Sequence, residues 1–347
     1  MGNLEETIKA LQKKFGKNYI ITGTELLKTD YKRHSLGIFG LDYAIGGGLP
    51  EKKILMLAGK EGSGKTSTAL ITTAAIQKTG GKVAWLIIEY GFDYFWATKL
   101  GVQVDKLLIA QPKTIEEISD TVEPLIMTRE LDLIVIDSIA SASSDKELEE
   151  SAEDYTRGGI AKIAGVMARK MVARLNDPSN PNIRTSVILL NQIREKMNVI
   201  YGNPNYTPGG HALHHQSDII IWLSPESEPL GGKGNPIGLN IKFRITKNRT
   251  APPFKTGVYG LLFEGGVEER QYIIELGIIL GIIQKEGYKY TFQDKSVTDI
   301  RPFIKSLTDE DWNYIKKQIL EKKEIVNIDI PITKIKKEVN SNLEGVV

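Results

Sequence analysis

The chain has 347 residues, of which 41% are hydrophobic and 25% are charged, and its formal net charge is +2 at pH 7. This length allows one large core with smaller appendages, and the absence of cysteine excludes disulfides, thiolate metal sites and cysteine nucleophiles. The near balance of charges says little about a polyanionic partner, so any basic surface has to be local.

The N-terminal segment is polar and carries no apolar signal sequence, and no apolar run approaches the ~20 residues of a membrane span. We therefore expect a cytoplasmic protein with no membrane partner. A helix is predicted to begin near Asn3 and end at Gly16. A helix this short is not stable alone, so its apolar stripe has to pack on the chain's own core or on a neighbouring subunit. The stripe consists of Leu4, Ile8, Leu11 and Phe15.

Residues 59–66 fit the P-loop pattern G-x-x-x-x-G-K-[ST] at every fixed position. The apolar run 54–57 predicts a buried strand before the motif, and residues 67–78 predict a helix after it. In such a loop the backbone N–H groups face inward at a positive helix N-terminus. Lys65 can then reach the β- and γ-phosphates, and the Thr66 hydroxyl can ligate Mg²⁺. The predicted nucleotide-binding residues here are Gly59, Glu61, Gly62, Ser63, Gly64, Lys65, Thr66 and Ser67.

Two further apolar runs end in an acidic residue, at the edge where open α/β sheets bind ligands. The run 83–88 ends at Glu89, a candidate to orient or deprotonate the attacking water, although position alone does not distinguish it from a surface glutamate. The run 131–136 ends at Asp137, which in a P-loop enzyme holds Mg²⁺ through its water shell.

A fourth strand, predicted over 186–190, is followed by Gln192 and a long loop. Since strands alternate with helices up to this point, the sequence predicts a doubly wound, mostly parallel sheet. The loop carries cations and ends at Gly209 and Gly210, so it is either a phosphate-contacting loop or an ordinary solvated one.

Two later strands, 219–223 and 240–245, are predicted to pair as a hairpin. Lys247 and Arg249 follow on an extended segment and project to the same side. They could clamp a phosphate or simply line a solvated edge. Beyond Gly266 the pattern changes to apolar helices and a small hairpin, which predicts a separate lobe.

The order of these elements resembles the bacterial RecA recombinase family over about residues 3–325. The P-loop is shared by many ATPases, but the run Asn191-Gln192-Ile193-Arg194, then 201–204 (YGNP), then Gly209-Gly210 is much more specific. Further matching stretches are 13–17, 47–50, 99–102, 136–138, 247–249 and 253–255.

This resemblance implies a RecA-type ATPase core over residues 34–266, an N-terminal helical oligomerisation segment over 1–33 and a small α/β C-terminal lobe with a tail over 267–347. It implies an ATP-dependent recombinase that uses ATP and Mg²⁺ and hydrolyses ATP when stimulated by DNA. Its partners would be single-stranded DNA, homologous duplex DNA and further copies of the same chain in a helical filament.

The resemblance also implies roles in catalysis. Glu89 matches the catalytic glutamate, and Gln192 matches a glutamine that senses the γ-phosphate. Lys247 and Arg249 match cations that reach a neighbouring subunit's nucleotide, like arginine fingers supplied in trans. Lys65 is also counted among the predicted catalytic residues. Asp93 and Trp96 match positions that bracket the adenine.

For DNA, the resemblance places a first loop at 149–158 and a second at 194–210. Met197 matches an apolar residue wedged between bases, and Arg157 stands where the family has an apolar residue. The predicted DNA-binding residues are Arg157, Arg169, Arg194, Lys196, Met197, Gly209 and Gly210.

Other departures concern Tyr90, where the family usually has histidine, and Gly62, where it usually has serine. His214 and His215 occupy a stretch that carries an aromatic interface residue in the family, and the acidic C-terminal tail is missing. A lost self-inhibition of DNA binding would follow from the missing tail.

Two other functions share the same core. A hexameric helicase is disfavoured by the matching N-terminal helix and by the absence of a large accessory helical domain. A regulatory ATPase that binds protein is disfavoured by the cationic second loop with its Gly-Gly end. Salt-sensitive DNA binding would separate the last from the others.

Overall fold

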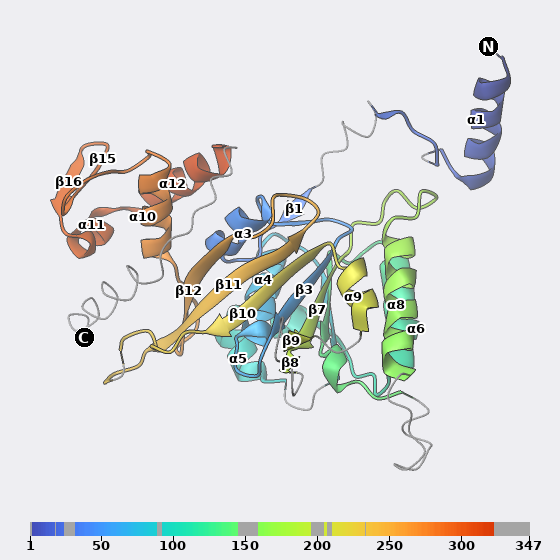
Figure 1. The fold of residues 1–347 in the computed structure, drawn as a ribbon, viewed down its shortest axis with the longest axis horizontal. Helices are drawn as coiled ribbons and strands as arrows, with labels where there is room; N and C mark the ends of the chain where they lie inside the picture. Colours follow the sequence, from blue (N-terminus) through green and yellow to red (C-terminus); the bar gives the residue numbers. More distant parts are fainter. Residues whose placement is uncertain are drawn as a thin grey trace.

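The computed structural model describes residues 2–17, 19–23, 32–88, 92–144, 159–195, 205–206, 210–232 and 234–322. Within these residues the central sheet has nine strands in the order β13-β12-β11-β10-β3-β7-β6-β4-β5 (Figure 1). Strands from β10 to β5 run parallel, and β11, β12 and β13 extend the sheet antiparallel. Their bounds are β3 Ile54–Gly59, β4 Val83–Ile87, β5 Leu108–Ala110, β6 Leu133–Asp137, β7 Ser186–Gln192, β10 Ile219–Pro225, β11 Gly238–Asn248, β12 Thr256–Leu262 and β13 Val267–Glu268.

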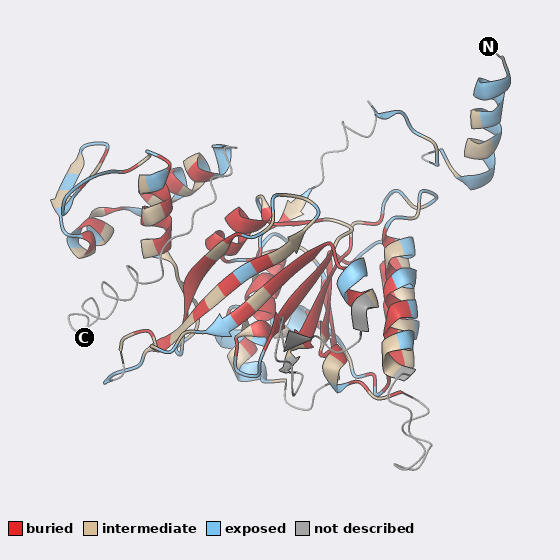
Figure 2. Cartoon of the chain, viewed as in Figure 1, coloured by how far each residue is buried: buried red, intermediate tan, exposed pale blue. Residues whose placement is uncertain are grey.

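Helices cover both faces of the sheet, because successive side chains of its buried strands point to opposite sides. Leu55 and Leu57 of β3 belong to one apolar cluster, with α3 (Phe39–Ile45) and α4 (Lys65–Lys78). Ile54 and Met56 belong to the other, with α6 (Ile115–Met127) and α8 (Gly159–Leu175). The predicted doubly wound α/β fold is therefore confirmed, and Figure 2 shows central strands such as β3 and β7 buried along almost their whole length.

The N-terminal helix α1 (Gly2–Phe15) leaves both ends of its apolar stripe exposed and its middle only half-buried. Leu4 is 72% exposed and Phe15 is 40% exposed. Figure 1 shows the helix standing apart from the sheet. Among the described residues, the chain's own core thus offers this stripe no cover, and no helix is long and apolar enough to cross a bilayer.

The remaining elements lie around the sheet and in the C-terminal lobe. In the core they are β1 (Arg33–His34), β2 (Leu49–Pro50), α5 (Tyr94–Lys99), β8 (Arg194–Glu195), β9 (Asn205–Tyr206) and α9 (Gly210–Gln216). In the lobe they are α10 (Arg270–Ile279), β14 (Gln284–Glu286), β15 (Lys289–Phe292), β16 (Lys295–Thr298), α11 (Ile300–Ser306) and α12 (Asp309–Glu321).

The lobe differs in detail from the sequence prediction. The first helix of the lobe, α10, ends at Ile279, because Gly281 adopts φ 68° and turns the chain. Residues 284–286 instead pair with β15, so the expected hairpin is a three-stranded sheet.

The lobe docks on α3 of the core. Tyr272 of α10 packs edge-on against Phe243, and Lys316 of α12 lies 5.7 Å from the centre of the Phe39 ring. Lys316 also pairs with Glu269 at 3.8 Å. The boundary at residue 267 stays a prediction.

Asp42 in α3 is a buried carboxyl group close to this junction. It accepts hydrogen bonds from the Leu36 N–H (2.7 Å) and the Ser35 hydroxyl. Burial nevertheless dominates and raises the pKa of Asp42 to about 7.

This pKa predicts a pH-dependent stability. Because the folded-state pKa lies above the ordinary value, the contribution of Asp42 is fully present below about pH 4 and is lost as the pH rises through about 7. Urea unfolding of the wild type and of Asp42→Asn between pH 4 and 8 measures it. We expect the free energy of unfolding to fall more steeply with pH in the wild type. Parallel curves for the two proteins would contradict the assignment.

Candidate nucleotide-binding site

The P-loop closes tightly between the end of β3 and the start of α4. A Cβ atom at Gly59 would lie 2.2 Å from Ser63 Oγ and 2.5 Å from the backbone oxygen of Leu223, so only glycine fits there. Gly62 and Gly64 adopt φ 69° and 84°, in the left-handed region that glycine enters without strain. These conformations give the tight turn that an anion-binding P-loop requires.

Lys65 lies across this turn. Its Nζ donates to the carbonyl oxygens of Lys60 (2.8 Å) and Gly59 (3.0 Å), and the side chain is buried. The loop's own carbonyl groups thus hold the ammonium at the position from which it can meet a phosphate.

Thr66 and Asp137 lie together although 71 residues separate them. The Thr66 hydroxyl donates to Asp137 Oδ2 at 3.1 Å, because Asp137 ends β6, two strands away from β3 in the sheet. A hydroxyl and a carboxylate are the hard oxygen ligands that suit Mg²⁺. No group of three or more His, Cys, Asp or Glu side chains in the described part of the chain could hold a metal, so phosphate oxygens and water would have to complete the coordination.

Glu89 and Tyr90 lie outside the described residues. The strand before them ends at the same edge as Asp137, since Ile87 pairs with Asp137 and the Ile88 N–H donates to its carbonyl oxygen at 2.7 Å. The role of Glu89 stays a prediction.

An aromatic wall lies beside the loop. Asp93 caps α5 by accepting a hydrogen bond from the Trp96 N–H (2.9 Å), and the Trp96 indole N–H donates to Ser67 Oγ at 3.0 Å. These bonds fix the indole next to the P-loop. The predicted contact of Asp93 with a base stays untested.

A cavity of about 300 Å³ opens between Trp96 and the antiparallel strands β11, β12 and β13, which we call the sheet extension. The sequence prediction missed its far wall, Leu239, Leu261 and Phe263, which comes from β11, β12 and the turn after them. In the sequence, the apolar run of β12 was the only available sign of this wall. Phe263 gave no sign of its own, because at 44% exposure it does not belong to a buried pattern.

Gln192 ends β7 directly beside the P-loop. It pairs with Gly59, and the Ile193 N–H donates to the Gly59 carbonyl oxygen at 3.0 Å. The chain then enters β8, which pairs with β9. The second predicted DNA loop, which begins at residue 194, therefore starts beside Gly59, the first glycine of the P-loop.

The family comparisons agree with this geometry. The family described as "RecA N-terminal domain" matches residues 2–268. The chain is 34% identical to Protein RecA of Mesomycoplasma hyopneumoniae (strain 7448) over 92% of this chain and 94% of that protein. It is 34% identical to Protein RecA of Bacillus licheniformis, with 92% and 91% covered, and 33% identical to Protein RecA of Thermus aquaticus, with 84% of each covered.

The chain belongs to the RecA family. The expected family and the expected RecA-type ATPase fold are thereby confirmed, and family membership implies that the core binds a nucleotide.

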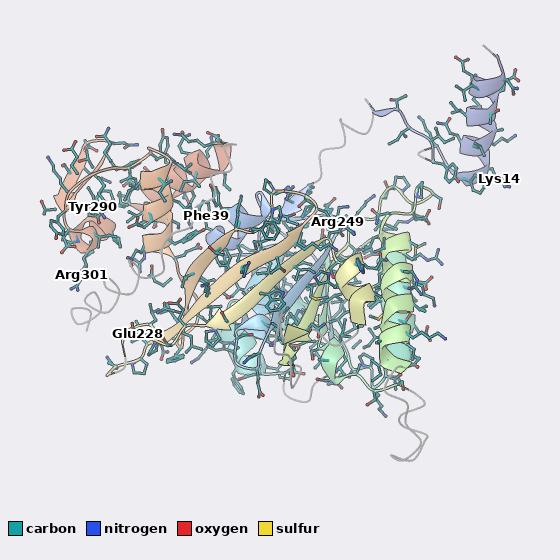
Figure 3. The ribbon with its side chains drawn as sticks, viewed as in Figure 1. Lys14, Phe39, Glu228, Arg249, Tyr290 and Arg301 are labelled. Atoms are coloured by element: carbon teal, nitrogen blue, oxygen red, sulfur yellow. The ribbon has the colours of Figure 1, made fainter. Side chains whose placement is uncertain are left out.

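Lys247 and Arg249 lie at the opposite edge of this RecA core from its P-loop. Lys247 of β11 pairs with Ile220 of β10, and Ile220 pairs with Met56 of β3. Met56 lies three residues, or about 10 Å, before Gly59 along β3. Figure 3 shows Arg249 at one end of the strands and Glu228, which comes after the last residue of β10, at the opposite end.

Both cations point to the end of α9. Lys247 Nζ donates to the carbonyl oxygens of His214 (2.7 Å) and His215 (2.9 Å), and Arg249 Nη2 donates to that of His215 at 2.8 Å. Cations favour this position because carbonyl groups at a helix C-terminus are unpaired and carry negative charge. Burial, and then the nearby Arg249, lower the pKa of Lys247. The two side chains therefore do not contact the P-loop of their own subunit.

The predicted DNA-binding residues are only partly described. Arg169 is exposed on α8, and α8 packs closely on α9 because Gly165 leaves room for Ala212. Arg194 and Gly210 are placed by their backbone alone. Arg157, Lys196, Met197 and Gly209 lie outside the described residues.

The glycines of the P-loop predict a sharp difference between two alanine variants. In Gly59→Ala the backbone has to shift, whereas a Cβ atom at Gly62 would meet nothing within 4 Å. Gly62→Ala should therefore cost only the left-handed strain of about 1–2 kcal/mol in stability. Gly59→Ala should weaken Mg·ADP binding by about tenfold or more, a loss of at least ~1.4 kcal/mol. Calorimetric titration of both variants with Mg·ADP compares their affinities, and equal affinities would contradict the steric argument.

Proposed function

We propose that this chain is an ATP-dependent DNA recombinase, a DNA-dependent ATPase that forms helical filaments on single-stranded DNA and catalyses homologous pairing and strand exchange. The observation that carries the proposal is the course of β7. This strand pairs with Gly59 of the P-loop through Gln192 and leads after Ile193 into the segment predicted to bind DNA. The strand β7 thus connects the P-loop directly to the predicted DNA-binding segment.

The cofactors are ATP and Mg²⁺. Lys65 and the inward-facing N–H groups of the P-loop would bind the phosphates, and Thr66, together with Asp137 acting through water, would hold the metal. When bound, Mg²⁺ would supply positive charge that neutralises the phosphates. Trp96 offers an aromatic face to the base, and Glu89 orients the attacking water.

The filament arises from two exposed features of the subunit. The apolar stripe of α1 packs on the next copy of the chain, because it has no cover among the described residues of its own core. Lys247 and Arg249, which face away from their own P-loop, act on the nucleotide of a neighbour.

The DNA partners are single-stranded DNA and a homologous duplex, and base pairing reads the homology. Arg169 and the second loop contact the phosphate backbone. The location that membership of the RecA family suggests is the cytoplasm of a bacterial or phage-infected cell.

Hydrolysis with and without single-stranded DNA tests the proposal, alongside Glu89→Gln. DNA should stimulate the wild type strongly. The variant should lose about 10²-fold or more of this activity, since it cannot activate water, while it still binds DNA. Hydrolysis that ignores DNA would exclude the recombinase and favour a regulatory ATPase. Unwinding of a forked duplex without homology would favour a helicase.

The trans-acting cations predict complementation between two inactive variants. Lys65→Ala removes a subunit's own phosphate site, and the double variant Lys247→Ala/Arg249→Ala removes what it gives to a neighbour. A mixture should recover part of the DNA-stimulated hydrolysis that each lacks alone, because mixed interfaces join an intact P-loop to intact cations.

Arg244→Ala is the matched control, since Arg244 is an exposed cation on the same strand. It should need no complementation. A mixture as inactive as its components would mean that the two cations do not act across a subunit interface.

A further inference from the structure

A buried chain of hydrogen bonds reaches the P-loop from β12. Thr68 in the first turn of α4 donates its hydroxyl proton to the carbonyl oxygen of Gly64 at 2.7 Å. The same Thr68 oxygen lies 2.7 Å from the hydroxyl of Tyr259. Because a threonine hydroxyl has one proton, Tyr259 has to be the donor in the second bond.

The surroundings of Tyr259 keep it in this role. Its side chain is 2% exposed and that of Thr68 is 1% exposed. Burial raises the pKa of Tyr259 well above its ordinary value, so the donor proton is retained. Successive hydrogen bonds of this kind polarise and strengthen one another in a low dielectric.

The carbonyl group at the end of this chain fixes an N–H group that faces the phosphate. The carbonyl of Gly64 and the N–H of Lys65 belong to one planar trans peptide, so they point in opposite directions. The Gly64 oxygen is directed along α4, where it also accepts the Thr68 N–H at 2.9 Å. The Lys65 N–H is therefore directed out of the helix N-terminus, where P-loops bind phosphate.

A second contact holds the same glycine. Ile241 of β11 lies so close that a Cβ atom at Gly64 would meet it at 3.3 Å. Ile241 and Tyr259 are directly opposite each other in the β11–β12 pair. One cross-strand pair in the sheet extension thus contacts Gly64 directly and through Thr68.

We propose that Tyr259 is a positioning residue for the phosphate site, which it aligns through Thr68 and the Gly64–Lys65 peptide. This inference rests on nucleotide binding in the proposed function. The sheet extension is then part of the nucleotide site, because the peptide that binds phosphate is aligned by a side chain from β12.

Binding of Mg·ADP without DNA, measured by calorimetry, tests the proposal in a double-mutant cycle. Tyr259→Phe should weaken binding by about threefold to tenfold, as expected for one net hydrogen bond. Thr68→Val should weaken it at least as much, and Thr68→Ser, which keeps the hydroxyl, should recover most of that loss. The double variant Tyr259→Phe/Thr68→Val should bind no worse than Thr68→Val, since both changes break one chain.

Tyr43→Phe is the matched control. Tyr43 is 7% exposed and its hydroxyl has no hydrogen-bond partner within the described structure, so its removal should leave the affinity unchanged. Thermal unfolding without nucleotide reports any general loss of stability.

Three results would overturn the inference. They are wild-type affinity in Tyr259→Phe, fully additive losses in the double variant, or an equal loss in Tyr43→Phe. A wild type that binds no Mg·ADP would overturn the proposed function together with this inference.

Discussion

The backbone closure at Gly59 is the constraint on which the rest of the site depends. The space for a Cβ atom at this position is taken by Ser63 and by the backbone of Leu223 in β10. Three parallel strands meet here, because β3 is flanked by β10 and β7. The loop can curl as it does only while those neighbours hold their register, so the phosphate site is a property of the sheet and not of the eight-residue motif alone.

The parallel order of the strands brings the other groups to the same edge. Asp137 comes from β6 and Gln192 from β7, each at a strand's carboxyl end, as ligand sites in open α/β sheets require. The antiparallel strands β11 and β12 contribute differently, through side chains along their length such as Ile241, Tyr259 and Leu261. The parallel strands therefore supply the side chains with predicted chemical roles, and the antiparallel strands supply side chains that pack against the site.

The sequence predicted where the described groups at the ends of the parallel strands lie, because their signals are local, whereas the role of Glu89 stays a prediction. An apolar run with an acid at its tip is enough to place Asp137, and the P-loop pattern is enough to place Lys65 and Thr66. The contribution of the antiparallel strands was largely missed, since contacts such as Tyr259 with Thr68 or Ile241 with Gly64 join segments that no local pattern relates. The helix α6 was also missed, although Thr114 and Glu117 provide a start signal, because it carries a proline in its interior.

Lys247 and Arg249 show a different limit and carry a further consequence. Their spacing told us that they share a side, but not that α9 would be their acceptor. The donors that bind His214 and His215 cannot at the same time be given to another chain without loss. If the proposed filament uses these cations, each N–H group that turns from α9 to a neighbour would leave a carbonyl group of the last turn that has to find water or a new donor. Such an exchange would rearrange the end of α9, whose first residue, Gly210, closes the second predicted DNA loop.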